Sequence, residues 1–476
     1  MKLKDYKGIP VSHLMRFLLI AGIVSIFLIF CIVFAFVTIF SRQAVEQQYN
    51  VLELVSTTES TAANTGTMQF SVETTVTTTV NSDAEVEIKN TTEIATSEIA
   101  DTSETSTEAE SVVFATDTMQ EDSIVEEMLD AMTLEDKIYQ LFIVTPEALV
   151  NNGVSCGTES GEMTKNALQE KPVGGIIYFA QNLVDGEQTK CMISNAQMYA
   201  EERNGIGLWI AVDEEGGMVA RVASKLGTTN YSSMEYYGSI GNTDEVYSVG
   251  QGIAADISSF GFNLDFAPVA DINLNPNNEL GDRIFSSDAN VVSDMVGAMV
   301  SGLQSNGQVS ATLKHFPGLG ASGGNTHSDS QTIIYRTYEE LMQNEFVAFR
   351  GGIDAGADFV MVGHQTMSAA DDNMPSDLSG VVVNYWLRGD LGFQGVVVTD
   401  AHQMNTISSN YTSGDAAVMA IQAGVDIVLM PADLNDAFYG VYNAVQSGQI
   451  SENRIDESVR RILTKKEAHG LLQGGE

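Results

Sequence analysis

Basic residues are scarce in this sequence. Its 476 residues include 23 Lys and Arg against 63 Asp and Glu, which gives a formal net charge of −40 at pH 7. Binding to nucleic acid depends on clustered Lys and Arg that neutralise phosphates, and docking on anionic lipids needs the same cations. The composition therefore argues against both classes of partner and leaves an uncharged small ligand compatible.

Cysteine is almost as scarce, with three residues in the whole chain. Cys31 lies in a long apolar run, so Cys156 and Cys191 are the two that remain for the rest of the sequence. Two cysteines make no disulfide framework, and the sequence leaves open whether they pair. No Cys or His spacing typical of a metal site is present. We expect neither a metal nor a cofactor.

Residues 17–40 form an apolar run of 24 positions without one charge, enough to span a hydrocarbon core of roughly 30 Å. Four basic residues precede the run, and Arg42 is the one basic residue between it and Lys89. This bias predicts a cytoplasmic segment 1–16, a transmembrane anchor and an extracytoplasmic remainder at the cell membrane. A cleaved signal peptide fits less well, since its apolar core is about 7–15 residues and a small-residue cleavage site follows.

Residues 41–120 are rich in Thr, Ser and Glu and contain little apolar side-chain surface. Such a composition cannot offset the entropy lost on ordering, so it predicts a disordered stalk between the anchor and a folded domain at 121–476. Within that domain, Thr133 precedes Asp136 by three residues, a pattern typical of a helix start.

Eight short apolar runs alternate with amphipathic stretches in the folded domain. They are QLFIVTPE (140–147), GGIIYFAQN (174–182), LWIAVDEEGG (208–217), FNLDFAPVADIN (262–273), SATLKHFPG (310–318), DFVMVGHQTM (358–367), GVVVTDAHQM (395–404) and VDIVLMP (425–431). Runs this apolar are typical of parallel strands buried on both faces. Eight of them predict a (β/α)₈ TIM-type barrel. The alternative, an open doubly wound sheet, usually has a Gly-rich phosphate turn after its first strand, which is missing here.

Polar side chains follow these runs where each predicted strand ends. The positions are Asp213, Asp271, Lys314, His315, His364 and Asp400. Active sites of (β/α)₈ barrels lie at the carboxyl ends of the strands. Four of the six histidines, His315, His327, His364 and His402, fall on that face, which predicts a catalytic site there.

Two segments stand out within this face. VVVTD places the carboxylate of Asp400 where an apolar strand emerges, and the alternative is an Asp that caps the next helix. KHFPGLGASGGNTH runs from a strand into a Gly-rich loop that we expect to be mobile and to carry His327 toward the barrel mouth. An imidazole can donate and accept a proton near neutral pH, whereas an exposed loop histidine without a role is the alternative.

Several motifs occur together in one order along the chain. They are DEEGG (213–217), APVADIN (267–273), DRIFSSD (282–288), KHFPG (314–318), MVGH (361–364), VVVTDAHQM (396–404) and AGVDIVLMP (423–431). On these motifs the region 124–472 resembles glycoside hydrolase family 3, in its single-domain β-N-acetylhexosaminidase branch. The motifs are specific as a set and cover nearly the whole predicted barrel.

The resemblance implies retaining hydrolysis of terminal β-N-acetylglucosaminyl or related residues. It implies Asp400 as the nucleophile and His327 as the general acid/base. It also implies a sugar pocket lined by Asp213, Arg283, Lys314, His315 and His364. The expected partners are small carbohydrates, such as cell-wall or chitin-type fragments, bound by a monomeric barrel.

The chain departs from the family pattern at three positions. Leu319 stands where a second His is usual, Met218 where an Arg is usual, and Asn325 where an Asp normally supports the catalytic histidine. An amide cannot stabilise the positive charge of an imidazolium, and Asp329 is a second candidate for that support. The alternative is therefore a catalytically weakened, sugar-binding or cell-wall-sensing protein on the same barrel.

Two further alternatives are weaker. A metal-dependent barrel hydrolase using His315, His364, His402 and Asp400 would usually open with a pair of histidines after its first strand, and QLFIVTPE contains none. A β-glucosidase or β-xylosidase of the same family usually carries a further domain that supplies the acid/base residue. The sequence ends soon after the eighth run with ENRIDESVRRILTKKEAHGLL, so we expect the hexosaminidase branch.

Overall fold

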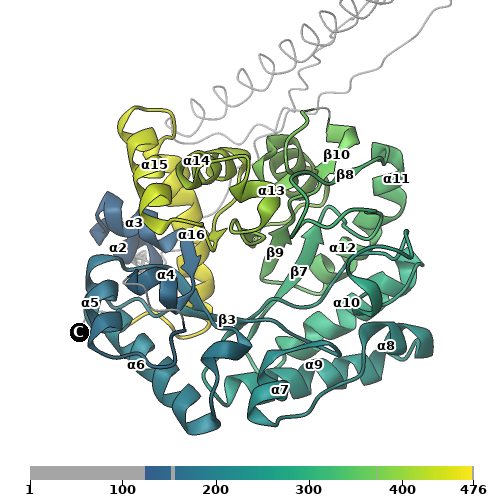
Figure 1. Cartoon of the computed structure of the whole chain (residues 1–476), viewed down its shortest axis with the longest axis horizontal. Coiled ribbons are helices and arrows are strands. Elements are labelled where there is room, and N and C mark those ends of the chain that lie inside the picture. The colour runs from purple at the N-terminus through teal and green to yellow at the C-terminus, as the bar shows by residue number, and fades with distance from the viewer. Residues whose placement is uncertain (1–123, 152–155, 371, 474–476) are drawn as a thin grey trace, which may run out of the picture. The chain divides into compact units, whose positions relative to one another are not determined.

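The computed structural model describes residues 124–151, 156–370 and 372–473 (Figure 1). The expected cytoplasmic segment, anchor and stalk lie outside these residues. Across the described ranges, no helix combines the length and the apolar character that a membrane crossing needs. Both Cys156 and Cys191 are exposed and unpaired, which answers the question of pairing that the sequence left open.

Eight parallel strands form the central barrel of the described region. They are β1 (Phe142–Val144), β2 (Gly175–Ile177), β3 (Trp209–Val212), β6 (Leu264–Asp265), β7 (Ser310–Phe316), β9 (Phe359–Val362), β11 (Val396–Thr399) and β12 (Val428–Leu429). From β1 to β11 each strand of this set pairs with the next one, and β12 pairs with β1. A single parallel bridge between Val398 of β11 and Ile427, the residue before β12, leaves the barrel nearly closed. The predicted (β/α)₈ barrel is confirmed.

Helices surround the strands (Figure 1). Before the barrel come α2 (Ile124–Ala131) and α3 (Leu134–Gln140). The first half of the barrel carries α4 (Pro146–Val150), α5 (Glu162–Glu170), η1 (Ala180–Asn182), α6 (Gly186–Asn204), α7 (Arg221–Leu226), α8 (Met234–Ile240) and α9 (Thr243–Ser258). As predicted, Thr133 caps α3, and its side chain accepts a hydrogen bond from the Asp136 N–H at 3.1 Å.

The second half of the ring begins after β6. It consists of η2 (Gly281–Arg283), α10 (Ala289–Leu303), α11 (Tyr338–Gln343), α12 (Glu345–Asp354), η3 (Ser368–Ala370), η4 (Ser376–Leu378) and the π-helix η5 (Val381–Asp390). After β11 come α13 (Asn405–Ser408), α14 (Ser413–Ala423), α15 (Leu434–Gln446) and α16 (Glu452–Ala468). Apolar faces of these helices pack on the strands, which are buried along their whole length.

The floor of the barrel, at the amino ends of the strands, is covered by the end of α16. Ser310 and Asp358 stand at the starts of β7 and β9, and His469 follows α16. Ser310 Oγ lies 2.9 Å from the Asp358 carboxylate and 2.9 Å from His469 Nε2. Lys465 also donates to Asp358. These four residues are the floor cluster, which ties the last helix to the strands.

The opposite face, at the carboxyl ends of the strands, carries the longer connections. A hairpin of β4 (Glu214–Gly216) and β5 (Val219–Ala220) follows β3. Two short strands, β8 (Ile333–Ile334) and β10 (Thr366–Met367), pair beyond the loop that follows β7. These connections build the mouth of the barrel.

Candidate active site

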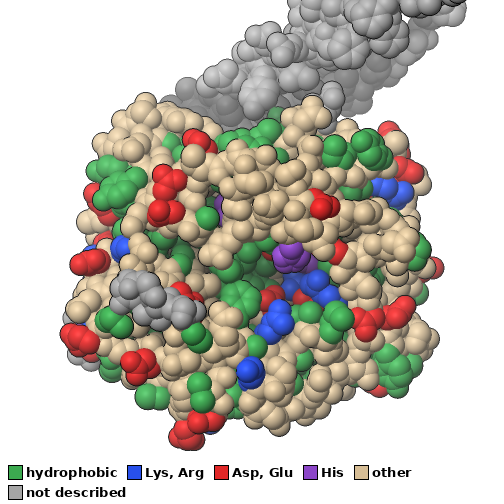
Figure 2. Space-filling view, in the orientation of Figure 1, with side chains coloured by type: hydrophobic (Ala, Val, Ile, Leu, Met, Phe, Trp, Pro, Cys, Tyr) green, Lys and Arg blue, Asp and Glu red, His purple; other side chains and the backbone are tan. Residues whose placement is uncertain are grey.

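A cavity of about 430 Å³ opens at the mouth of the barrel. Six residues predicted from the sequence line it: Asp213, Arg283, Lys314, His315, His327 and Asp400. The hollow lies in the middle of the face shown in Figure 2, with basic and histidine side chains beside it. Sequence positions up to 187 residues apart, from 213 to 400, therefore meet at one place, as the strand-end argument predicts.

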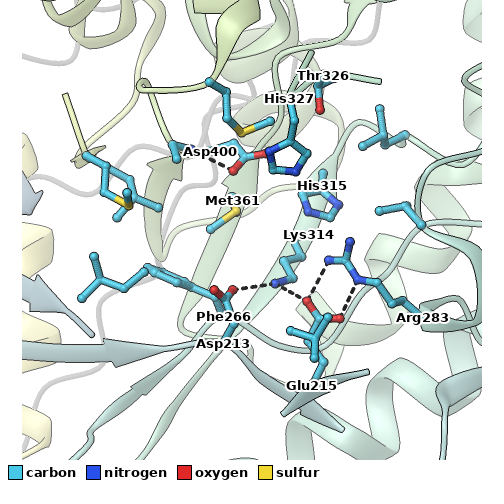
Figure 3. Close-up of a pocket in the computed structure, with 18 of the residues that line it drawn as sticks. Asp213, Glu215, Phe266, Arg283, Lys314, His315, Thr326, His327, Met361 and Asp400 are labelled. Carbon is cyan, nitrogen blue, oxygen red and sulfur yellow. Dashed lines mark hydrogen bonds and ion pairs between the residues drawn. The ribbon is translucent and has the colours of Figure 1, made fainter. Parts of the chain in front are cut away.

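One side of the cavity is an ionic cluster formed by Asp213, Glu215, Arg283 and Lys314 (Figure 3). Lys314 Nζ lies 3.0 Å from Asp213 Oδ1 and 2.5 Å from Glu215 Oε1. Arg283 donates two hydrogen bonds to Glu215, each of 2.8 Å. Burial disfavours ionisation of Glu215, but the charges of Lys314 and Arg283 outweigh it and hold its pKa at about 2.

The side chains of Glu214 and Glu215 point in different directions, so their pKa values shift in opposite directions. Glu215 points into the ionic cluster, whereas Glu214 turns to α7 and accepts hydrogen bonds from the N–H groups of Val222 at 2.6 Å and Ala223 at 3.0 Å. Successive residues of a strand project to opposite faces, and the short hairpin obeys this rule. Burial raises the pKa of Glu214 to about 7 despite these two bonds.

His315 is held in place by the buried carboxylate of Asp271. Asp271 Oδ2 lies 2.8 Å from His315 Nδ1 and accepts the His315 backbone N–H at 3.0 Å. Its other oxygen accepts the N–H of Leu319, whose side chain lines the cavity. Because Nδ1 is engaged, Nε2 is the ring nitrogen of His315 that remains for a ligand.

Asp400 follows β11, and its carboxylate borders the cavity. Its backbone N–H still pairs with Val362 at 2.9 Å, while its Oδ1 accepts the N–H of Ala401 at 2.8 Å. Burial alone would raise the pKa of this carboxyl, but His364, His315, the Ala401 N–H and Lys314 lower it below its ordinary value. The group is therefore ionised, as a carboxylate nucleophile must be.

His327 reaches the same cavity from the loop after β7. In Figure 3 His327 and Asp400 lie in the upper part of the view, and the ionic cluster lies below them. Thr326 donates to Glu279 through both its N–H and its hydroxyl, at 3.0 Å each. Thr406 Oγ1 donates to the Thr326 carbonyl at 3.0 Å. This loop, predicted to be mobile from its glycines, is thus bonded to neighbouring segments on two sides.

Asn325 and Asp329 accept hydrogen bonds from the backbone around His327 and form none with its ring. Asn325 Oδ1 accepts the N–H groups of His327 at 3.0 Å and Ser328 at 3.3 Å. Asp329 Oδ2 accepts the Asn325 N–H at 2.8 Å. Among the described residues, no side chain hydrogen-bonds to the His327 imidazole. The ring can therefore turn toward a substrate, but no carboxylate supports its charge.

The structure places His364 away from the sugar pocket in which the resemblance would set it. Its side chain is fully buried, outside the cavity lining, and its Nε2 lies 3.0 Å from the Ala401 carbonyl. It therefore contacts the segment that carries Asp400 and has no access to a bound ligand.

Two carboxylates at the cavity were missed as individual residues by the sequence reasoning, Glu215 and Glu279. Glu215 lies within the quoted DEEGG motif, so the motif contained a signal that was not used. Glu279 lies in a polar loop with no periodic pattern, and its role in holding Thr326 depends on a contact across 47 positions. No group of His, Cys, Asp and Glu in the described ranges has the arrangement of a metal site.

Comparison with known proteins agrees with this geometry. The model of the glycosyl hydrolase family 3 N-terminal domain matches residues 133–465. "Beta-hexosaminidase A" of Pseudoalteromonas piscicida is 30% identical over 62% of this chain, although the match spans only 53% of that protein. "Beta-hexosaminidase" of Nitrosomonas eutropha is 30% identical over 67% of this chain and 93% of its own length.

A solved structure supports the same assignment. A family 3 β-N-acetylglucosaminidase from Paenibacillus sp. FPU-7 is 35% identical, with a TM-score of 0.67 over 72% of this chain and 64% of that one. The barrel, the motifs at its mouth and the family match agree over the same residues. This chain belongs to glycosyl hydrolase family 3.

Proposed function

We propose that this protein is a retaining β-N-acetylhexosaminidase that removes terminal β-N-acetylglucosaminyl or related residues. The observation that carries the proposal is that an ionised carboxylate, Asp400, and an unbonded imidazole, His327, line one cavity. The names of the family 3 relatives support the substrate class.

In the first step Asp400 attacks the anomeric carbon and forms a glycosyl ester. The bond to the leaving oxygen breaks as that oxygen takes a proton from the His327 imidazolium. In the second step His327, now neutral, accepts a proton from water, and the water oxygen attacks the anomeric carbon. The ester bond to Asp400 breaks, the sugar leaves with retained configuration, and both side chains return to their starting states.

The ionic cluster serves the sugar rather than the leaving group. Asp213 keeps 19% of its side chain exposed at the cavity and can accept from hydroxyl groups. Arg283 and Lys314 are donors fixed by Glu215, and His315 offers Nε2. Since these side chains are already held by one another, little conformational entropy is lost when a sugar binds.

Turnover of 4-nitrophenyl β-N-acetylglucosaminide, with release of β-configured sugar seen by NMR, tests this proposal. A slow fluorinated substrate should then leave a covalent label on the peptide that contains Asp400, detected by mass spectrometry. Inverted product, or a label on another residue, would contradict the assigned mechanism.

A second candidate is a catalytically weakened sugar-binding protein on the same barrel. The observation that favours it is the His327 ring, which has no carboxylate partner because Asn325 bonds to backbone groups. In serine proteases, exchanging the supporting Asp for Asn slows the reaction by about 10⁴-fold. Binding of N-acetylglucosamine without turnover at any pH would favour this candidate.

For the cellular setting, we propose a single-pass anchor at 17–40, a stalk at 41–120 and a monomeric barrel outside the cytoplasm. Support comes from the uncharged run and from the basic residues that precede it. Substrates such as cell-wall or chitin-type fragments fit that location. The protein should stay with membranes after carbonate extraction, and protease added to intact cells should release the barrel. A soluble full-length chain would exclude the anchor.

A further inference from the structure

A buried cluster of two histidines and one carboxylate lies behind the candidate nucleophile. This inner triad consists of His364, Asp377 and His402, with 0, 0 and 2% of their surface exposed. His364 Nδ1 and Asp377 Oδ1 are 3.2 Å apart, an ion pair whose alignment falls short of a hydrogen bond. His402 Nε2 and Asp377 Oδ2 are 2.9 Å apart. In the described part of the chain, no Lys or Arg pairs with Asp377.

Both histidines act on the short turn that presents Asp400. His364 Nε2 lies 3.0 Å from the carbonyl of Ala401, and the N–H of Ala401 donates to Asp400 Oδ1 at 2.8 Å. His402 belongs to the same turn, and its backbone N–H donates to the β12 carbonyl of Leu429 at 3.0 Å. Asp377 therefore holds the turn that follows Asp400 through the imidazole rings of His364 and His402.

The two rings differ in charge. Nε2 of His364 lies beside the Ala401 carbonyl and Nδ1 lies 3.2 Å from Asp377 Oδ1, so both nitrogens face oxygens and the surroundings suit an imidazolium. Burial works against this charge, but the carboxylates of Asp377 and Asp400 raise the pKa of His364 to about 9. The ring of His402 has one oxygen partner, Asp377 at Nε2, and its Nδ1 has no hydrogen-bond partner among the described residues. Burial lowers the pKa of His402 below the ordinary value.

We propose that Asp377 is a positioning residue for the hydrolysis. Through His364 it fixes a positive charge behind Asp400, and through Ala401 it fixes the direction of the attacking carboxylate. The inference rests on the proposed function, in which Asp400 is the nucleophile. Besides His364, the titratable groups that face Asp400 and lower its pKa are His315 and Lys314, so His364 is one of three side chains that favour the ionised nucleophile.

The variant Asp377→Asn tests this role because it keeps the size of the side chain and removes its charge. His364 should lose its proton, and the pKa of Asp400 should rise as one nearby cation disappears. The acid limb of kcat/KM should move to higher pH by about one unit. At neutral pH kcat/KM should fall by at least about tenfold. KM should change little, because Asp377 does not reach the cavity.

A second readout works without turnover. Titration of ¹⁵N-labelled imidazoles by NMR should show His364 protonated up to about pH 9 in the unmodified protein and neutral at pH 7 in Asp377→Asn. If the unmodified protein does not turn over any glycoside, the proposed function fails while this titration still reports on the triad. A neutral His364 at pH 7 in the unmodified protein would overturn the inference.

Matched variants separate positioning from folding. Asp358→Asn removes a buried carboxylate beside a histidine at the floor of the barrel, and its acid limb should stay in place. If Asp377→Asn does not fold, His364→Gln removes the same charge and keeps an amide that can donate to the Ala401 carbonyl. The double variant should shift the limb no further than either single variant, and additive shifts would show that Asp377 does not act through His364.

Discussion

The two ends of the barrel each contain a buried carboxylate beside histidine, and the surroundings of the two carboxylates differ. At the floor, Asp358 meets Ser310, His469 and the ammonium of Lys465, whose side chain is 31% exposed. At the mouth, the fully buried Asp377 meets two imidazoles and no Lys or Arg in the described ranges. The floor carboxylate is paired with an ammonium and one imidazole, whereas the mouth carboxylate is paired with imidazoles alone.

This difference separates stabilising ion pairs from those that set reactivity. Burial works to raise the pKa of Asp358, but its hydrogen bonds with His469, Lys465 and Ser310 and the charge of Lys465 leave it below its ordinary value, which favours the folded state. This carboxylate does not line the cavity. Burial works to raise the pKa of Asp377, but His364 and then His402 lower it to about 2. Through His364, the charge of Asp377 is therefore expected to affect the pKa of the neighbouring Asp400. Variants at the two ends should accordingly alter different measurements.

The largest expected effect is that of Asp400→Ala. Loss of a nucleophile should lower kcat by at least about 10⁴-fold, because the variant has lost the carboxylate that forms the glycosyl ester. Added azide should restore turnover and give a glycosyl azide of inverted configuration, a product detectable by NMR. Unchanged kcat in a correctly folded variant would remove Asp400 from the mechanism.

His327→Ala should have the next largest effect. Loss of a general acid/base is expected to lower kcat/KM by about 10³-fold for substrates with poor leaving groups. Substrates with activated aryl leaving groups need less protonation, so their first step should slow much less. A plot of rate against leaving-group acidity measures this difference, and equal slopes for the variant and the unmodified protein would contradict the role of His327.

The fold could be predicted from the sequence because its signal is local. Each of the eight apolar runs contains one barrel strand, although the strands are shorter than the runs. In the run 262–273, only Leu264–Asp265 is a strand, since Pro268 has no N–H for a ladder and the pairing beyond it is a single bridge between Val269 and Lys314. Helix ends followed local rules as well, as Thr133 at the start of α3 shows.

The site was only partly predictable, because some of its contacts depend on distant pairs. Strand ends predicted that Asp213, Lys314 and Asp400 share one face. Asp377 could not be found in this way, since it lies in the short 3-10 helix η4, away from any strand end, and its partners are 13 residues earlier and 25 residues later. The fully buried His364 carries no mark in the sequence that separates it from a ligand-binding histidine.

At the floor, Asp358→Asn should affect stability instead of activity. Removing one partner of a buried ion pair is expected to lower the free energy of unfolding by about 3 kcal/mol. Lys465 and His469 would then face an amide in place of a carboxylate. Urea unfolding at pH 7 measures the loss, and kcat/KM should be retained below the midpoint. A large loss of kcat/KM in the folded variant would contradict the claim that the floor carboxylate affects stability and the mouth carboxylate affects activity.

The smallest expected effect is on stability and compares two consecutive lysines of α16, Lys465 of the floor cluster and its neighbour Lys466. Lys465 pairs with Asp358, whereas the fully buried Lys466 donates to the Gln140 side chain at 2.8 Å and pairs with no carboxylate in the described ranges. Burial therefore lowers the pKa of Lys466 to about 7. An unfolded lysine keeps its proton up to about pH 10.4, so between these two values the unfolded chain binds more protons than the folded one.

It follows that the cost of burying Lys466 is fully present below pH 7 and is relieved as the pH rises. Lys466→Met removes this cost, so the variant should gain more stability over the unmodified protein at pH 6 than at pH 9, by about 2 kcal/mol. Urea unfolding at the two pH values measures the difference. Lys465→Met is the matched control and should lose stability at both pH values, because it leaves Asp358 without its ion-pair partner on α16. An equal effect of Lys466→Met at pH 6 and pH 9 would mean that the lysine is already neutral, or already solvated, in the folded barrel.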